Sequence, residues 1–234
     1  MDNRIVNQEV SYLRNKISDF PITNGDGKFN NDGEPLKWPG CSIILPISKN
    51  SLLSNTLVDI QERFKEIAPH KKYTYLPQSS FHMTLFDCCN VSTINTSTWP
   101  KNISFSDNYL ETARILSNRI KKFKYPNLLR LKLNKFFGGF STLLMPATTE
   151  DNEILRNCRD DLSNLLKIRH ENHYRYTFHI TLSYLLKPLT NIEIEILKDL
   201  EIKIQKDFKK VIPMIELSNP KLCTFNDMYE FNEI

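Results

Sequence analysis

Two histidines of this chain stand in nearly identical five-residue motifs. The motifs are Phe81-His82-Met83-Thr84-Leu85 and Phe178-His179-Ile180-Thr181-Leu182. In a β-strand, residues i and i+2 point to the same face, so each H-x-T pattern would present one imidazole beside one hydroxyl, with apolar neighbours buried on the other face. Either motif alone is typical of a core histidine in a strand. Their repetition favours a shared site.

The residue types of the two motifs indicate chemistry at a phosphate. Imidazole titrates near neutral pH, so two histidines can serve as general base and general acid on opposite sides of one reacting group. The two threonine hydroxyls can donate hydrogen bonds to non-bridging phosphate oxygens. We therefore expect a catalytic set of His82, Thr84, His179 and Thr181 that requires no nucleophilic Ser or Cys, no metal and no cofactor. Which histidine is the acid and which the base stays open.

Residues just before the second motif are candidate substrate contacts. His173 and Arg175 would share the strand face of His179 if the strand extends that far. An arginine there can pair with a phosphate through two hydrogen bonds, although a surface ion pair is an equally good interpretation. His170 and His173 have the spacing of a metal pair but lack a third ligand at a suitable distance.

Other chemistry-bearing residues have simpler interpretations. The five cysteines are odd in number and contain no C-x-x-C, which favours buried free thiols over zinc or disulfides. Tyr73 and Tyr75 precede the first motif, where an aromatic ring at a cleft mouth can stack on a base. Half-buried strand tyrosines are the common alternative.

Composition and length define the class of protein. The 234 residues carry 31 Lys and Arg against 27 Asp and Glu and are 40% hydrophobic, which is ordinary globular composition. Apolar runs such as residues 43–47 and 182–189 are shorter than the roughly 20 residues of a membrane span. The first residues show no apolar signal segment, so we expect a cytoplasmic monomer without membrane contact.

Positive charge is concentrated in one segment. Residues 112–149 contain no Asp or Glu, and Lys and Arg supply eight positive charges there. Such a block is typical of proteins that bind a polyanion, because clustered cations displace phosphate counterions. Arg130 and Lys132 would then extend the positive potential of the cleft. A solvated helix face followed by a solvated strand face is the alternative.

Periodicity predicts a mixed order of elements. Helical spacing covers residues 52–68, 106–123, 150–168 and 190–209, whereas strand patterns cover residues 41–47, 73–76, 81–86, 129–133, 140–145 and 177–185, with one or two strands before residue 225. Gly138-Gly139 is typical of a hairpin turn. We expect an α+β fold with two similar lobes of antiparallel sheet, helices on the outer faces, a pseudo-two-fold and the cleft between the lobes.

The first residues are expected to lie outside this domain. Residues 3–18 have the spacing of a short amphipathic helix, and residues 20–40 have the composition of an irregular connection. We therefore divide the chain into an N-terminal extension, residues 1–36, and a bilobal domain, residues 37–234.

The double H-x-T pattern resembles the 2H phosphoesterase superfamily, which includes 2′,3′-cyclic phosphodiesterases and 2′-5′ RNA ligase-like proteins. The resemblance spans roughly residues 40–190 and is closer still to a domain-of-unknown-function branch of that superfamily. The similar stretches are residues 28–33, 38–40, 76–84, 159–170 and 174–182. The resemblance implies a bilobal α+β fold and metal-free phosphodiester chemistry at the two motifs. It does not imply one substrate.

Three functions follow as hypotheses. The first is a hydrolase that opens a 2′,3′-cyclic phosphate, or cleaves another 2′-oxygen-linked phosphodiester of RNA or a nucleotide, by two-histidine acid–base catalysis. The second is a nucleotide-binding or RNA-binding module of the same fold without turnover. The third is a scaffold whose basic block docks nucleic acid while both histidines lie in the core.

Overall fold

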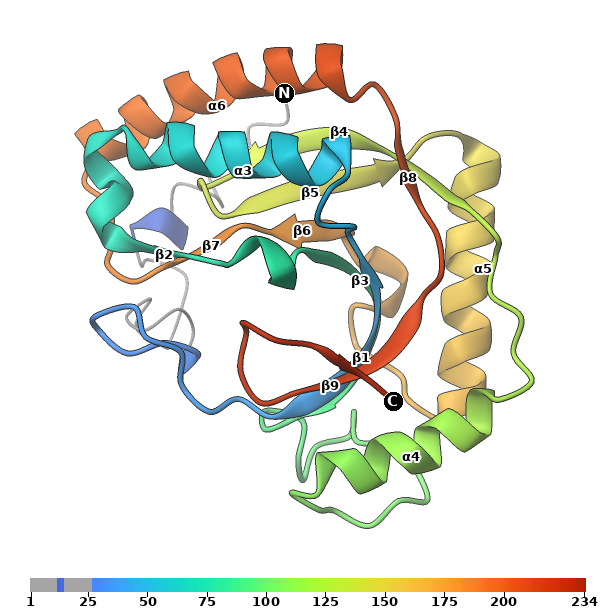
Figure 1. Cartoon of the computed structure of the whole chain (residues 1–234). Helices are drawn as coiled ribbons and strands as arrows, with labels where there is room; N and C mark the ends of the chain where they lie inside the picture. Colours follow the sequence, from blue (N-terminus) through green and yellow to red (C-terminus); the bar gives the residue numbers. More distant parts are fainter. Residues whose placement is uncertain (1–11, 15–26) are drawn as a thin grey trace.

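The computed structural model of the chain describes residues 12–14 and 27–234 (Figure 1). Its strands are β1 (Gly40–Pro46), β2 (Tyr73–Tyr75), β3 (His82–Asn90), β4 (Leu129–Phe137), β5 (Ser141–Pro146), β6 (His179–Thr181), β7 (Ser183–Leu185), β8 (Ile215–Leu217), β9 (Lys221–Phe225) and β10 (Asn232–Glu233). Its α-helices are α3 (Leu52–Lys65), α4 (Tyr109–Ile120), α5 (Thr149–Leu166) and α6 (Asn191–Val211). Short 3₁₀ turns cover Ala68–Lys72, Gln78–Ser80 and His173–Arg175.

Eight strands form one antiparallel sheet in the order β10-β9-β1-β3-β6-β5-β4-β8, and β2 pairs with β7 in a second, two-stranded sheet. The large sheet curls strongly (Figure 1). Its chain path explains why. Only residues 218–220 connect β8, at one edge, to β9, next to the other edge, and four Cα steps reach at most about 14 Å. The two edges must therefore approach one another.

The two motif strands are neighbours at the centre of this sheet. β3 and β6 pair antiparallel with Met83 opposite Ile180, the middle residues of the two H-x-T patterns. An antiparallel pair has a local two-fold axis, so the pairing relates one motif to the other. β1, β9 and β10 continue the sheet on the β3 side, and β5, β4 and β8 continue it on the β6 side.

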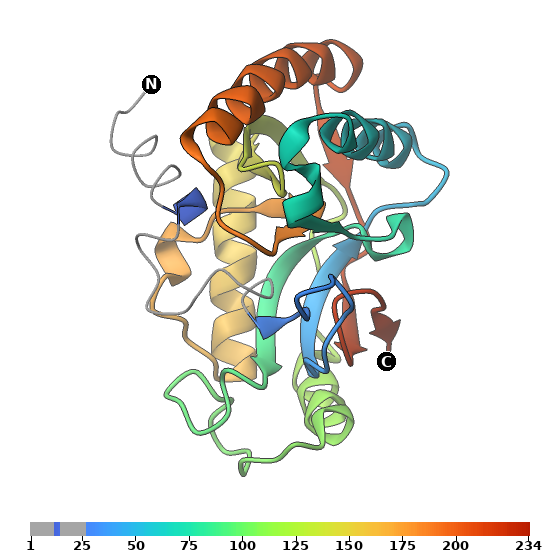
Figure 2. The same cartoon turned by 90° about the vertical axis from the view of Figure 1, so that its left-hand side faces the viewer.

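The amphipathic helices α3, α4, α5 and α6 pack around the sheet, as the two views show (Figures 1 and 2). α5 packs on β3, β4 and β5, α4 on β1 and β9, and α6 on β4 and α3. Local signals fix where the helices begin: Ser51, Asn108 and Thr148 accept hydrogen bonds as N-caps, and Thr190 forms a capping box with Glu193. None of the helices in the described residues has the length and apolar character that crossing a membrane requires.

The predicted fold class is confirmed: the structure is α+β with an antiparallel sheet and surrounding helices. The two halves share one continuous sheet and meet at β3 and β6. The hairpin at Gly138-Gly139 joins β4 to β5, and both glycines have positive φ angles of 61° and 71°.

Two predicted boundaries were wrong for local reasons. The helix predicted from residue 106 begins at Tyr109, because Asn108 is its cap, and it ends at Ile120. The strand predicted over residues 177–185 is split into β6 and β7, because the Leu182 N–H donates to Phe140 O and its carbonyl accepts from Leu76 N and the Gln61 side chain.

The predicted helix over residues 3–18 lies outside the described residues except for 12–14. The proposed boundary at residue 36 stays a prediction, but part of the extension contributes to the core. Phe29 is fully buried, and its ring centroid lies 4.9 Å from that of Tyr184 and 5.9 Å from that of Tyr229.

Replacing Gly40 by alanine is expected to destabilise the fold by about 1–3 kcal/mol, the usual cost of overpacking. A Cβ at this position would lie 2.6 Å from Cys89 O, 2.6 Å from Phe225 Cζ and 2.7 Å from Asn90 Cβ, so β1, β3 and β9 would have to separate. Urea unfolding measures the change, with Ser97→Ala in an exposed turn as the control. A Gly40→Ala protein as stable as the control would show that these strands tolerate more space.

Candidate active site

The structure brings all four predicted catalytic residues to one pocket of about 180 Å³. The pocket is lined by Lys28, Trp38, Ser42, Leu76, His82, Thr84, Asp87, Asn90, Tyr176, His179, Thr181, Tyr184, Phe225, Met228 and Phe231. It lies on the face of β3 opposite α5, because α5 packs against the side chains that point the other way.

Strand alternation aims the four side chains. His82, Thr84, His179 and Thr181 are half-buried and line the pocket, whereas the intervening Met83 and Ile180 are fully buried. Continuing the Met83–Ile180 register by one residue sets His82 beside Thr181 and Thr84 beside His179. Directly opposed residues have Cβ atoms about 5 Å apart, and diagonal ones about 7–8 Å. Each imidazole therefore lies beside the hydroxyl of the other motif, and the two imidazoles lie on a diagonal.

Both imidazoles are held in the same way. His82 Nδ1 lies 2.7 Å from Ser80 O, and His179 Nδ1 lies 3.0 Å from Thr177 O, each carbonyl two residues upstream. A carbonyl only accepts, so in both rings Nδ1–H is the donor, which leaves Nε2 to exchange a proton with a substrate. Two backbone bonds with the same geometry thus select the same tautomer on both strands.

The surroundings of His82 differ from those of His179. The Phe231 ring, from the C-terminal segment, lies 4.2 Å from the His82 ring between centroids. Burial lowers the pKa of His82 to about 4, and repulsion from His179 acts in the same direction, against the hydrogen bond to Ser80 O and the attraction of Asp87. His82 is therefore neutral at pH 7 and can accept a proton there.

Two β-bulges in β3 add polar residues to the pocket wall. Opposite β1, the register passes from Ile44↔Thr84 to Ser42↔Asp87 to Gly40↔Asn90, so two residues of β1 face three of β3 at each step. After each bulge, the next side chain that faces the pocket comes one residue later than strict alternation would place it. The pocket-facing residues of β3 are therefore His82, Thr84, Asp87 and Asn90, all of which line the pocket.

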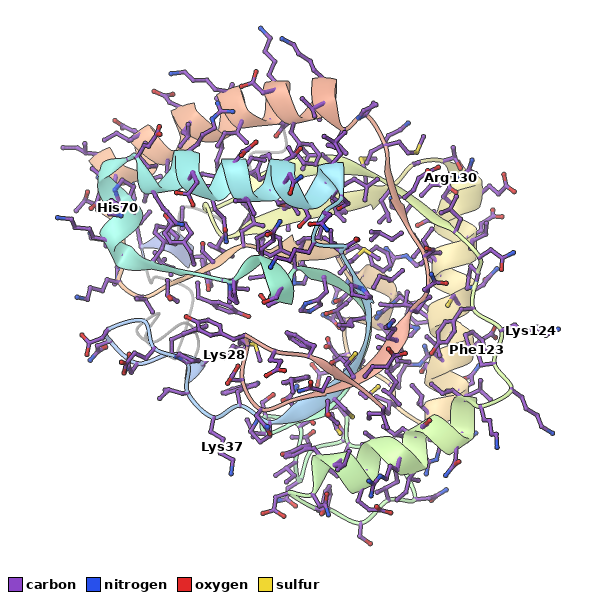
Figure 3. All side chains as sticks on the ribbon, viewed as in Figure 1. Lys28, Lys37, His70, Phe123, Lys124 and Arg130 are labelled. Atoms are coloured by element: carbon purple, nitrogen blue, oxygen red, sulfur yellow. The ribbon has the colours of Figure 1, made fainter. Side chains whose placement is uncertain are left out.

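One wall of the pocket is aromatic and carries a lysine. Lys28 Nζ lies 5.7 Å from the Trp38 ring centroid and 5.1 Å from that of Tyr184. Among the described residues that line the pocket, Lys28 is the only lysine or arginine. Figure 3 shows Lys28 at the side of the molecule away from Arg130 and Lys124.

A buried arginine supports the floor of the pocket. Arg159, on α5, is 1% exposed, and its guanidinium carbon lies 4.0 Å from the Tyr176 ring centroid. It donates a short hydrogen bond to the carbonyl of Leu85, the residue skipped by the first bulge. Arg159 thus connects α5 to a pocket-lining ring and to the bulge that aims Asp87.

The two predicted substrate contacts lie elsewhere. His173 is buried, with Nε2 2.8 Å from Asp160 Oδ1, and Arg175 is exposed; neither lines the pocket. The inference rested on a strand that continued upstream of His179. That expectation was wrong, because His173–Arg175 form a 3₁₀ turn, in which side chains do not alternate.

The remaining candidates serve packing. His170 contacts Asp87 O at 2.8 Å while His173 faces Asp160, so the two rings do not converge. No group of three or more His, Cys, Asp or Glu able to hold a metal occurs in the described part of the chain. Tyr73 is buried and donates to Gly138 O at 2.8 Å, and Tyr75 packs beneath Lys65. All five cysteines are free and buried.

The basic block does not reach the pocket. Arg130 pairs with Asp151 at 2.9 Å, and Lys132 Nζ donates to Ala147 O at 3.3 Å. Both lie on β4, which is separated from β3 by β6 and β5. Neither residue lines the pocket, where Lys28 is the lysine found, so the prediction that both extend the positive potential of the cleft toward an oligonucleotide is not supported by their position.

Several pocket residues escaped the sequence interpretation. Lys28, Trp38 and Tyr176 lie in stretches that carried the family resemblance. The resemblance therefore pointed to these stretches, but it assigned no role to the three residues. Asp87 and Asn90 are out of phase with His82 until the bulges are known. Phe231 lies far from both motifs in the sequence, and nothing in its neighbourhood indicated a site.

The sheet is curled and antiparallel, and each of its two central strands directs the histidine and threonine of an H-x-T motif into one pocket. This arrangement is the one expected from the resemblance to two-histidine phosphoesterases. Residues 28–138 match the family model 2H-phosphodiest, described as a domain of unknown function (DUF1868). The match confirms the predicted resemblance: the matched part of the chain, which holds the first motif, is similar to the 2H-phosphodiesterase family.

Two relatives cover nearly the whole chain. An uncharacterized protein, 127L, of Invertebrate iridescent virus 6 is 24% identical over 223 residues, which cover 90% of this chain and 95% of the viral protein. The crystal structure of a conserved protein of unknown function from Agrobacterium tumefaciens str. C58 superposes with a TM-score of 0.90 at 23% identity and covers 97% of each chain. This second likeness shows that the fold is shared.

Replacing Phe231 by alanine is expected to raise the pKa of His82 from about 4 toward its ordinary value, by at least about one unit, because water would reach the imidazole. Titration of the His82 ring protons by NMR measures the shift. Phe105→Ala, at an exposed ring that packs on Trp99, is the control and should leave His82 unchanged. A wild-type His82 that titrates near 6.5 would contradict the inferred desolvation.

Proposed function

We propose that the chain is a phosphodiesterase that hydrolyses a 2′,3′-cyclic phosphate, or another phosphodiester with a ribose 2′-oxygen, by two-histidine acid–base catalysis. One observation carries the proposal: both H-x-T motifs direct their histidine and threonine into the same pocket, and both imidazoles are anchored through Nδ1. The 2′-oxygen is what the superfamily resemblance implies.

The two imidazoles would divide the proton transfers. His82 Nε2, neutral because of its burial, takes a proton from the attacking water as the water oxygen bonds to phosphorus. The bond between phosphorus and the leaving oxygen breaks, and His179, protonated at Nε2, donates its proton to that oxygen. The diagonal arrangement of the rings supports attack and departure on opposite sides of one phosphate.

The threonines and the aromatic wall would hold the substrate. Thr84 and Thr181 each stand beside the histidine of the other strand, where a hydroxyl can donate to a non-bridging oxygen. Trp38 and Tyr184 offer ring faces on which a base can stack, and Lys28 between them adds positive charge. Hydroxyl donors for the phosphate, ring faces for the base and one positive charge are the features that a nucleotide or RNA substrate requires.

Two further hollows adjoin the pocket, one on each side. A space of about 190 Å³ shares His82 and Phe231 with it, and another of about 160 Å³ shares Lys28, His179, Thr181 and Tyr184. Groups on either side of a bound phosphate would find room there, which is consistent with a diester that carries more than one nucleoside.

His82→Ala and His179→Ala are each expected to lower kcat at least about a hundredfold, because general acid or base catalysis contributes roughly 10²–10⁴. Thr84→Val and Thr181→Val should cost less, since each removes one hydrogen bond. The assay is a panel of 2′,3′-cyclic nucleotides, cyclic-phosphate-ended RNA, 2′-5′ and 3′-5′ oligonucleotides and cyclic dinucleotides, all with EDTA. His70→Ala, outside the pocket, is the matched control.

Three outcomes would contradict the proposal. They are near-full turnover by either alanine variant, activity that EDTA abolishes and a divalent metal restores, or binding without turnover across the whole panel. The last result would favour the nucleotide-binding module of the same fold.

The kcat/KM of the wild-type protein is expected to have a bell-shaped pH dependence. The base must be neutral, so activity should fall as pH drops through the pKa of His82, about 4, well below the usual imidazole range. Activity should fall again at higher pH, when the general acid loses the proton that it donates. Because the two imidazoles interact, the pKa values read from the two limbs of the pH profile describe the pair of histidines rather than either histidine alone. An acidic limb near 6.5 would show that His82 is not the base.

A further inference from the structure

Asp87 and Asn90 are polar residues of the pocket to which the acid–base steps assign no proton transfer and no contact with the phosphate. Both are half-buried and line the pocket on the same strand as His82 and Thr84. On β1, Thr84 is paired with Ile44, Asp87 with Ser42 and Asn90 with Gly40. These β1 partners are spaced two residues apart. At about 3.3 Å per residue, Asp87 lies about 7 Å beyond Thr84 along the strand and Asn90 about 13 Å. This is the reach of a nucleoside whose phosphate sits at the histidines.

The free hydrogen-bonding atoms of this pair have opposite character. Asp87 Oδ1 accepts from Ser42 Oγ at 3.1 Å, and Asp87 Oδ2 has no partner within the described part of the chain. Asn90 Oδ1 accepts from Ser92 N and Oγ, so its amide group is oriented, and its Nδ2 has no partner in residues 12–14 and 27–234. The pocket thus presents one anionic acceptor and, further along, one oriented donor.

A carboxylate is an unexpected neighbour for a phosphate site. It repels the bound anion, and burying it against a ligand without donors would cost free energy. The buried Arg159 attracts Asp87 electrostatically, but its hydrogen bond goes to Leu85 O rather than to the Asp87 carboxylate. A ligand that donates hydrogen bonds to the Asp87 carboxylate would compensate for this cost, because a hydrogen bond to a charged group is stronger than one between neutral groups.

We propose that Asp87 and Asn90 read the base of the substrate and select guanine, an inference that rests on the proposed function of the same pocket. The guanine edge carries two adjacent donors, N1–H and the N2 amino group, which match a carboxylate. Its O6 acceptor lies beside them and matches the Asn90 amide. Adenine lacks the adjacent pair of donors, and uracil has a single N–H between two acceptors. Trp38 and Tyr184 supply ring faces for the same base.

The test compares guanosine with inosine 2′,3′-cyclic phosphate, which differ only in the N2 amino group. The wild-type protein is expected to hydrolyse the guanosine compound with a kcat/KM about 10- to 100-fold higher, the value of one hydrogen bond to a charged group. Asp87→Asn should abolish that ratio, because it lowers kcat/KM for the guanosine compound more than for the inosine compound, which keeps only the N1–H donor. Asp59→Asn, at an exposed aspartate of α3, should leave the ratio unchanged.

Several results would overturn the inference. A wild-type protein that hydrolyses both compounds equally retains the proposed function and disproves base reading. An Asp87→Asn protein that loses activity on all nucleotides by the same factor, with a displaced pH profile, would show that Asp87 acts on His82. If neither compound is hydrolysed, cyclic mononucleotides are not the substrate, and calorimetric binding of guanosine and inosine 3′-monophosphate to wild type and Asp87→Asn still decides the base preference.

Discussion

The pairing of Met83 with Ile180 is the constraint on which the site depends. These two side chains are fully buried on the helix-covered face, so the residues on either side of each must face the pocket. A slip of one residue in either strand would send an imidazole and a hydroxyl into the core. The apolar packing between sheet and α5 therefore stabilises the fold and also keeps two histidines and two threonines on one surface.

The local two-fold symmetry of this pair does not extend to the surroundings. Both imidazoles donate to a carbonyl two residues upstream, but only His82 packs against Phe231. An aromatic ring in contact with an imidazole removes water and favours the neutral form. Two motifs of nearly the same sequence can thus assume different proton-transfer roles, because distant segments of the chain cover them unequally.

Regular periodicity made much of this structure predictable. The helical spacings located α3, α5 and α6. Prediction failed where the backbone departs from a regular period. The 3₁₀ turn at His173–Arg175 invalidated the face assigned to those side chains, and the bulges that skip Leu85 and Cys88 brought in two residues that strict alternation would have directed inward.

The sequence by itself indicated the four residues of the H-x-T motifs and the α+β class, because these follow from side-chain type and local period. Only the tertiary structure decided what surrounds the motifs. Lys28 and Phe231 reach the pocket from opposite ends of the chain, and Arg130 is held by Asp151 on another face. Such contacts depend on the curl of the sheet and on the paths that residues 27–39 and 226–234 take beside it, which no local pattern encodes.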